Sequence, residues 1–270
     1  MKYILILLFS IILIFQGCKN EPKDQIVVIK TDFGDMKIKL YNKTPRHRDN
    51  FIRLAKDGFY NNLLFHRVMN EFMIQGGDPD SKNAKPGEQL GNGGPGYELP
   101  AEIHFPQLFH KKGAIAAARE GDSVNPEKKS SGSQFYIVQG KIFTDDQLNK
   151  IEERVNGMKN KQIYYSLMSE NKDTLVALQK EGKFDEYTEL QQNIRNKAKK
   201  IIGKQAKYTI PDSIREVYKT VGGTPHLDTN YTVFGEVIEG LNVIDSIAAV
   251  ETDPNDRPVK GIKMIVEIVK

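Results

Sequence analysis

The sequence predicts a mainly β protein that is interrupted by one block of α-helices, and two observations lead to that prediction. Apolar residues alternate or run together over strand-length segments in residues 25–143, and they do so again from residue 231 to residue 268. Residues 144–222 are instead rich in Lys, Glu, Gln, Asn and Leu, contain little Gly or Pro, and repeat apolar residues at helical spacing. We therefore expect a sheet-based domain built from 25–143 and 223–270, with a helical subdomain inserted at 144–222.

The composition is that of a soluble globular protein. The chain has 270 residues, of which 39% are hydrophobic and 27% charged, which is enough for one or two domains with a sizeable core. The net charge of +4 is spread along the chain, so the composition gives no reason to expect nucleic acid as a partner. The one cysteine excludes an intramolecular disulfide and a cysteine-cluster metal site.

The first residues resemble the export signal of a bacterial lipoprotein. An apolar run from Tyr3 to Phe15 has the length of a signal-peptide core and is shorter than the roughly 20 residues of a membrane-spanning helix. A small residue then precedes Cys18, as in a lipobox, where the cysteine is lipidated. We expect a signal peptide at 1–17, a lipidated tether at 18–24, and an extracytoplasmic protein anchored to a bacterial cell membrane. The alternative is an uncleaved anchor with a buried cysteine.

The first elements after the tether are a predicted hairpin and a predicted helix. Apolar residues at 26–29 and the alternating run at 36–40 flank turn-forming residues at 32–35, which predicts a β-hairpin. Thr44 is a candidate N-cap directly before a proline, so a helix is predicted from 44 to 57. Short apolar runs separated by Gly, Pro and Asn predict further strands at 63–68, 73–75, 114–118 and 134–138.

The helical block begins at a capping motif and ends before sheet-like sequence resumes. Thr144 and Gln147 have the spacing of a capping box, and apolar residues recur behind them every three or four positions. Several amphipathic helices are therefore expected before about residue 221. The last strands are predicted at 231–235 and 262–268.

Three blocks of the sequence resemble the signature of a known enzyme family. They are residues 65–78, residues 132–137, and Leu227–Asp228 together with residues 233–235. In order and spacing they resemble the cyclophilin-type peptidyl-prolyl cis-trans isomerases, except that the helical block lies between the second and the third. The resemblance implies a closed eight-stranded antiparallel barrel capped by two helices, one at 44–57 and one near 241–247.

The chemistry of such an enzyme can be argued from the peptide bond itself. Rotation about an X–Pro bond breaks amide resonance against a barrier of about 18–20 kcal/mol. No bond is made or broken, so no nucleophile, metal or cofactor is required. The twisted prolyl nitrogen gains a lone pair, which a fixed cation stabilises by donating a hydrogen bond. We assign this role to Arg67, because a guanidinium is always charged and is a rigid donor.

The resemblance also implies which residues surround the arginine. Gln75 is expected to orient Arg67 and to contact the substrate backbone. A pocket for the proline ring is expected from Phe72, Met73, Tyr136 and Leu227, with Ala118 nearby. Four residues depart from the commoner family residue and leave substrate preference open: Tyr136 for phenylalanine, His226 for tryptophan, Tyr231 for histidine and Arg119 for asparagine. The last two are expected to alter the pocket wall and the strip that docks the substrate backbone, and His226 is expected among the substrate-binding residues.

The expected function is acceleration of X–Pro bond rotation in proteins that fold outside the cytoplasm, with proline-containing peptides and unfolded proteins as partners. The alternative is a binding module, a chaperone or assembly factor that grips proline segments with little turnover. The segment 222–225 runs from the helical block into His226 and Leu227, so we expect the block beside the groove, where it holds unfolded clients.

Other motifs favour ordinary structural roles. Residues 91–96 formally satisfy G-x-G-x-x-G, but no strand precedes them and no helix follows, so we interpret them as a loop that lines the groove. The five histidines show no metal-ligand spacing. Lysines between 197 and 207 are interpreted as a solvated helix face, with a site for an acidic partner as the alternative.

Overall fold

The computed structural model describes residues 25–269, and its centre is an eight-stranded antiparallel sheet in the order β10-β1-β2-β9-β6-β8-β4-β3. The predicted strands are all present, with ends shifted by a few residues. Their bounds are β1 Gln25–Thr31, β2 Gly34–Leu40, β3 Phe65–Met69, β4 Met73–Gly76, β6 Ala114–Ala117, β8 Phe135–Val138, β9 Val233–Glu239 and β10 Ile265–Ile268. A separate two-stranded sheet pairs β5 (Glu98–Leu99) with β7 (Ser130–Ser131).

The alternation along the first hairpin explains how the sheet divides core from solvent. The predicted hairpin is present, and because Thr31 pairs with Gly34 its turn is two residues, 32 and 33, rather than the four predicted at 32–35. Met36 and Ile38 of β2 are fully buried in the main core, while Lys37 between them extends outward. Because side chains alternate across a strand, one face of each strand packs into this core and the other faces away from it.

The sheet curls, but the predicted closed barrel is not confirmed. Its edges are β10 and β3, and within residues 25–269 these two strands do not pair along their length. The segments beside them meet at one isolated bridge between Leu64 and Lys263, with a backbone hydrogen bond of 2.9 Å from Phe65 N–H to the Ile262 carbonyl. Two more backbone hydrogen bonds of 2.9 Å cross here, from Asn62 N–H to the Met264 carbonyl and from Met264 N–H to the Leu63 carbonyl, but the pairing does not extend along β3 and β10. The sheet is thus a half-barrel.

Two helices cover the sheet where the resemblance implied them. α1 spans Pro45–Lys56 and buries Phe51 and Leu54, and α6 spans Leu241–Ala248. Thr44 occupies the N-cap position of α1 but makes no side-chain capping bond. Glu102 caps the helix instead, because its carboxylate accepts from two backbone N–H groups of the first turn, at 3.2 and 3.0 Å.

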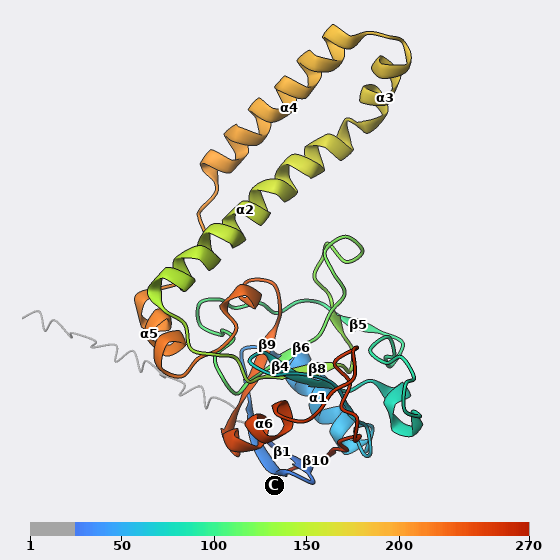
Figure 1. The fold of residues 1–270 in the computed structure, drawn as a ribbon, viewed down its shortest axis with the longest axis vertical. Coiled ribbons are helices and arrows are strands. Elements are labelled where there is room, and N and C mark those ends of the chain that lie inside the picture. Colours follow the sequence, from blue (N-terminus) through green and yellow to red (C-terminus); the bar gives the residue numbers. More distant parts are fainter. Residues whose placement is uncertain (1–24, 270) are drawn as a thin grey trace, which may run out of the picture.

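The helical block forms four helices: α2 Asp145–Glu170, α3 Lys172–Lys180, α4 Phe184–Lys204 and α5 Asp212–Thr220. The predicted capping box at Thr144 is present, with both of its hydrogen bonds to Gln147. Figure 1 shows most of α2, α3 and α4 extending away from the sheet, while α5 and the start of α2 lie at the base. We call residues 163–204 the arm, and residues 144–162 with 205–222 the foot.

The foot and the arm have separate apolar cores. The foot packs against the sheet domain, because Phe105 and Phe109 join a cluster of foot residues that includes Leu148, Val155, Ile214 and Tyr218. The arm holds a smaller cluster of its own, formed by Leu167, Leu175, Ile194 and Ala198. The foot is therefore continuous with the sheet domain, whereas the arm is stabilised mainly by contacts within itself.

The helical block leaves and rejoins the sheet domain at one place. Lys141 and Gly223 form a bridge with backbone hydrogen bonds of 3.2 and 3.0 Å in the two directions. A Cβ on Gly223 would lie 2.2 Å from the carbonyl oxygen of His110, so only glycine fits here. The boundaries at 143/144 and 222/223 stay predictions, and the signal peptide and tether lie outside the described residues.

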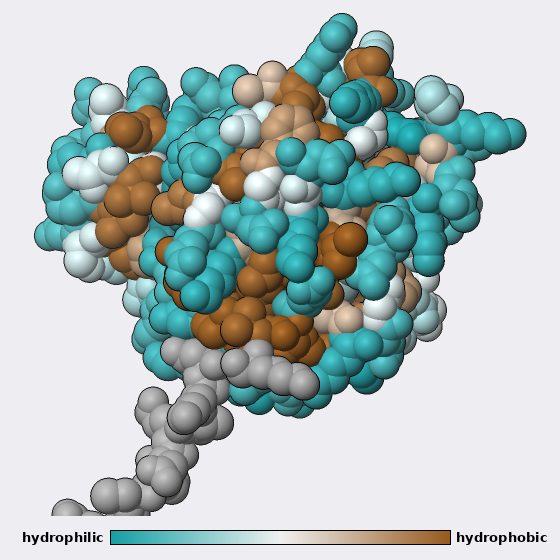
Figure 2. Space-filling view, turned by 90° about the horizontal axis from the view of Figure 1, so that it is seen from below, coloured by the Kyte–Doolittle hydropathy of each residue, from teal (hydrophilic) through white to brown (hydrophobic). Residues whose placement is uncertain are grey.

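The surface of the sheet domain includes an apolar groove beside the β1–β2 turn. A groove of about 390 Å³ lies between the β1–β2 turn and residues 250–262, and Phe33, Val250 and Val259 are among its lining residues. Figure 2 shows apolar side chains gathered among hydrophilic ones on the face seen from below. The residues predicted for the site lie elsewhere.

Candidate active site

A cleft of about 420 Å³ brings together nearly all of the predicted site residues. Its lining includes Arg67, Gln75, Phe72, Met73, Ala118, Arg119, Tyr136, Leu227 and Tyr231. His226 is the exception: it is exposed beside the cleft, and its ring stacks on Phe72 with 5.6 Å between the ring centroids. Residues far apart in the sequence thus meet in one cleft.

The floor of the cleft is apolar because of strand alternation. Met73 of β4 and Tyr136 of β8 face away from the main core, while their neighbours Ile74 and Phe135 point into it. Leu227 lies at the end of a short 3₁₀ helix, Pro225–Leu227, and packs against the same cluster. The floor can therefore accept an apolar ring.

Arg67 lies at one side of this floor and is held by two contacts. Its Nε lies 3.5 Å from Asp256 Oδ2, and its Nη2 donates to Met69 Sδ at 2.9 Å. Within residues 25–269, Nη1 has no hydrogen-bond partner. The side chain is 40% exposed, so a charged donor reaches the cleft.

Gln75 is placed as expected but is held differently. It pairs with Arg67 across the β3–β4 ladder. Its side-chain amide donates to Gln134 Oε1 at 3.0 Å, and Gln134 in turn donates to the carbonyls of Gly91 and Gly93. Asp256 and Met69, rather than Gln75, therefore hold the guanidinium in this structure.

Arg119 forms a clamp in the wall of the cleft. Its side chain is only 4% exposed and donates to the Asn230 carbonyl at 2.7 Å and to Asp122 Oδ1 at 2.6 Å. Its guanidinium also lies 4.8 Å above the ring of Tyr231. Burial alone raises the pKa of Asp122, but hydrogen bonds from Arg119 and from Gln162 of α2 bring that pKa below its ordinary value. The foot of the helical block therefore contacts Asp122, the residue that holds Arg119 in the wall of the cleft.

Sequence reasoning missed several lining residues. His66, Asp253, Asn255, Arg257 and residues 88–90 line the cleft, as do Gly91 and Asn92 of the loop interpreted as groove-lining. Arg257 is anchored by donation to the Glu88 carbonyl at 2.6 Å, far away in sequence, so no local pattern could have indicated it. The sequence could have indicated His66, because it directly precedes Arg67 in the first signature block.

Comparison with protein families matches residues 26–202 and 215–268 to the cyclophilin type peptidyl-prolyl cis-trans isomerase/CLD family. The chain belongs to this family. A provisionally named peptidyl-prolyl cis-trans isomerase of Staphylococcus saprophyticus is 31% identical to it over 254 residues, which are 93% of each chain. A counterpart of Staphylococcus aureus, also provisionally named, is 30% identical over 237 residues, or 87% of each chain. The chain is thus a cyclophilin-type peptidyl-prolyl isomerase.

Solved structures resemble this cyclophilin in fold. A crystal structure of a cyclophilin type peptidyl-prolyl cis-trans isomerase from Cryptosporidium parvum aligns with a TM-score of 0.53 and 18% sequence identity. The alignment covers 92% of this chain and 98% of that one. A second crystal structure of that protein, in the presence of the dipeptide Ala-Pro, aligns with a TM-score of 0.52.

We expect this cyclophilin to lose stability in acid, with His66 as a contributor. His66 is 4% exposed, and burial lowers its pKa to about 4. An unfolded chain binds a proton at this residue near pH 6.5, before the folded one does, so the free energy of unfolding falls as the pH drops from 6.5 towards 4. The contribution between pH 7 and pH 5 is about 2 kcal/mol.

Urea unfolding at pH 7 and pH 5 measures this difference. The His66→Gln variant, which does not titrate at this position, should show a smaller loss than the natural chain. An equal loss in both proteins would contradict the assignment.

Proposed function

We propose that the cleft is the active site of this isomerase and that it rotates X–Pro bonds of proteins that fold outside the cytoplasm. One observation carries the assignment of the site: an always-charged guanidinium, Arg67, and an apolar floor large enough for a proline ring line the same cleft. The floor immobilises the ring through apolar contacts while the acyl side of the bond rotates.

The arginine then acts on the twisted amide. As resonance is lost, the prolyl nitrogen gains a lone pair, and Arg67 Nη1 is free to donate a hydrogen bond to it. Asp256 and Met69 hold the other two nitrogens, so little reorganisation is needed when the charge develops. This hydrogen bond is stronger in the twisted state than in either planar isomer, which lowers the barrier.

Isomerisation of a proline tetrapeptide by the protein from Lys19 onward tests the proposal. A rate above that of the spontaneous reaction supports it. Binding of the peptide with no acceleration would favour the alternative, a proline-binding module with little turnover.

We also propose a lipid anchor at Cys18. The apolar run before it, its place directly after a small residue and the absence of any other cysteine support this. Among the helices of residues 25–269, none combines the length and the apolar character that crossing a bilayer requires. A multiply acylated N-terminus would hold the protein at the membrane, because one acyl chain alone binds only marginally.

The Cys18→Ala variant should move from the membrane fraction to the soluble fraction or stay unprocessed, because it lacks the acylated thiol. Cell fractionation with detection of the mature size measures this, and Ser10→Ala in the same leader serves as the control. Mature-sized Cys18→Ala protein that stays as tightly membrane-bound as the natural chain would show that lipidation is wrong.

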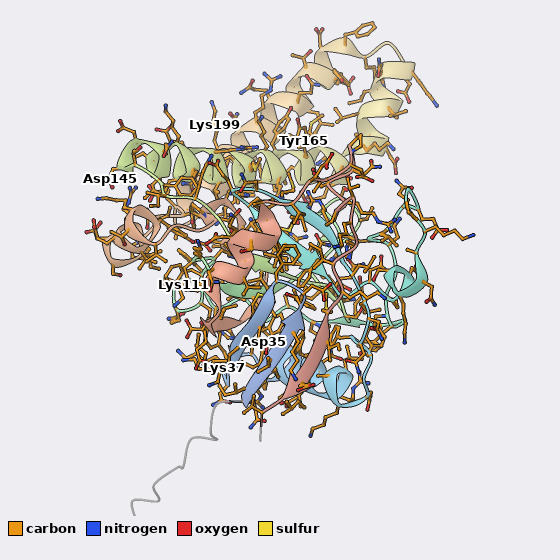
Figure 3. The ribbon with its side chains drawn as sticks, turned by 60° about the horizontal axis from the view of Figure 1, so that its bottom comes forward. Asp35, Lys37, Lys111, Asp145, Tyr165 and Lys199 are labelled. Carbon is orange, nitrogen blue, oxygen red and sulfur yellow. The ribbon has the colours of Figure 1, made fainter. Side chains whose placement is uncertain are left out.

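A specific observation favours a client-holding role for the arm. Tyr165 of α2 and Phe184 of α4 are 64% and 66% exposed, although aromatic side chains of this size are usually buried. A shallow groove of about 350 Å³ in the arm is lined by residues that include Leu175, Val176 and Tyr187. Figure 3 places Tyr165 and Lys199 on the helical block in the upper half of the view, away from Asp35 and Lys37 of β2 in the lower half. The arm therefore offers apolar surface to an unfolded chain.

Replacing the arm with a short Gly-Ser linker from Gln162 to Gln205 should separate this role from bond rotation. The two cut points are close, because Lys197 lies 3.9 Å from Glu170 and the helices run antiparallel towards the foot. We expect tetrapeptide isomerisation within a few-fold of the natural chain and a clear loss of activity on a refolding protein. The foot is kept because it packs on the sheet domain.

The double variant Tyr165→Ser/Phe184→Ser provides a milder version with the helices intact. If both activities fall together in a folded truncated protein, the arm is part of the catalytic structure. If neither falls, the arm has no part in client handling.

A further inference from the structure

A series of buried hydrogen bonds leads from the floor of the cleft towards the foot. The Tyr136 hydroxyl lies 3.0 Å from His110 Nε2, and His110 Nδ1 lies 2.8 Å from Asp228 Oδ1. All three residues are at most 4% exposed. The series therefore joins a residue of the cleft to a buried carboxylate.

Asp228 determines how the protons are arranged along this series of hydrogen bonds. Its Oδ1 accepts from both the backbone N–H of His110, at 3.0 Å, and the ring Nδ1. Since a carboxylate only accepts, Nδ1 carries a proton, and a ring that holds this one proton leaves Nε2 as an acceptor. The Tyr136 hydroxyl donates to it. Burial raises the pKa of Tyr136 well above its ordinary value, so this hydroxyl keeps its proton.

The consequence concerns the surface offered to a proline ring. A tyrosine in an apolar floor would bring a polar hydroxyl to the ligand unless that hydroxyl had a partner elsewhere. Here the hydroxyl is hydrogen-bonded to the buried ring of His110, and the rings of His110 and Tyr136 are nearly parallel, with an interplanar angle of 12°. The ring of Tyr136 is thus fixed, and its carbon atoms remain for the cleft.

The helical block supplies the last residue of this series of hydrogen bonds. Tyr218 of α5, in the foot, is fully buried, and its hydroxyl donates to Asp228 Oδ2 at 2.7 Å. Both carboxylate oxygens of Asp228 are therefore satisfied, one by the sheet domain and one by the insertion. Without Tyr218, Oδ2 of the buried carboxylate would lose its 2.7 Å donor, and only the Tyr208 hydroxyl, also in the foot, would remain to interact with Asp228.

We propose that Asp228, His110 and Tyr218 are positioning residues that hold Tyr136 in the floor of the proline pocket, so that the foot of the insertion completes this pocket. The proposal rests on the proposed function, because it takes the cleft as the proline-binding site. It assigns substrate binding, rather than bond rotation, as the step that the insertion supports.

The Tyr218→Phe variant tests the proposal because it removes one hydroxyl and keeps the ring. Loss of one hydrogen bond that positions the floor should raise KM for a proline tetrapeptide by about three- to tenfold, with a smaller change in kcat. Tyr60→Phe is the matched control: its hydroxyl is also buried and donates to the Ser133 carbonyl at 3.3 Å, outside this series of hydrogen bonds. It should lower stability without raising KM.

A double-mutant cycle shows whether the effect passes through Tyr136. Tyr136→Phe keeps the floor apolar and removes the hydroxyl that is hydrogen-bonded to His110. In that background, Tyr218→Phe should raise KM no further. Should Tyr218→Phe not fold, Asp228→Asn carries the same test, because its amide group cannot accept from Tyr218 while its oxygen still accepts from His110.

The outcomes separate the two proposals. Unchanged KM in folded Tyr218→Phe, or an equal rise in KM in both backgrounds, would overturn the positioning role while Arg67→Ala still loses activity. Full activity of Arg67→Ala would instead overturn the assignment of the cleft itself.

Discussion

Replacing Arg67 with alanine is expected to lower kcat/KM for a proline tetrapeptide by at least about tenfold, which corresponds to 1.4 kcal/mol of transition-state stabilisation. The reason is the loss of the charged donor beside the apolar floor. The free energy of unfolding should change little, because the side chain is 40% exposed and its ion pair with Asp256 is at the surface. Steady-state isomerisation kinetics and urea unfolding measure the two quantities.

Two further variants sharpen this result. Arg67→Lys keeps the charge but not the planar fork of donors, so it should recover only part of the activity. Arg195→Ala removes an exposed arginine from the arm and should leave the tetrapeptide kinetics unchanged. A folded Arg67→Ala protein with the natural kcat/KM would refute the mechanism and favour the binding-module alternative.

The largest expected effect on stability comes from Phe135→Ala, at about 3–5 kcal/mol. Phe135 is 1% exposed and lies at the centre of an aromatic group in the main core. Its ring packs edge-on against Phe51 at 5.3 Å, Tyr60 at 5.6 Å and Phe65 at 6.4 Å between centroids. Alanine would leave a cavity that these three rings cannot close without leaving the core.

Urea unfolding of Phe135→Ala against Phe184→Ala isolates the effect of burial. Both variants lose the same side chain, but Phe184 is 66% exposed and should cost less than about 0.5 kcal/mol. A similar small cost at both positions would mean that the aromatic group does not stabilise the fold.

Local patterns were sufficient to predict most elements of the fold. Alternation identified the strands, and helical spacing with the capping box at Thr144 identified the start of α2. Local patterns do not indicate which residues distant in the sequence will be in contact in the folded protein. The cap of α1 comes from Glu102, and the edges of the sheet depend on how 62–65 meet 262–264. Both outcomes are set by tertiary packing.

The same distinction holds for the cleft. Signature blocks located Arg67 and the floor, because those residues lie within short conspicuous motifs. Their distant partners were not predictable: Asp256 pairs with Arg67 from the far end of the chain, and the Asn230 carbonyl accepts a hydrogen bond from Arg119. A motif indicates which groups are present, whereas side-chain pairing depends on loops that meet only in the folded protein.

The place of β9 in the sheet has a consequence for biosynthesis. β9 is the strand that joins β10-β1-β2 to β6-β8-β4-β3, yet β8 ends at Val138 and β9 begins only at Val233, after the whole helical block. Chains grow from the N-terminus, so during synthesis the edges of β2 and β6 stay unpaired until the insertion has been made. Unpaired edges invite association with other chains. This peptidyl-prolyl isomerase thus passes, while it is being made, through a state with two unpaired strand edges.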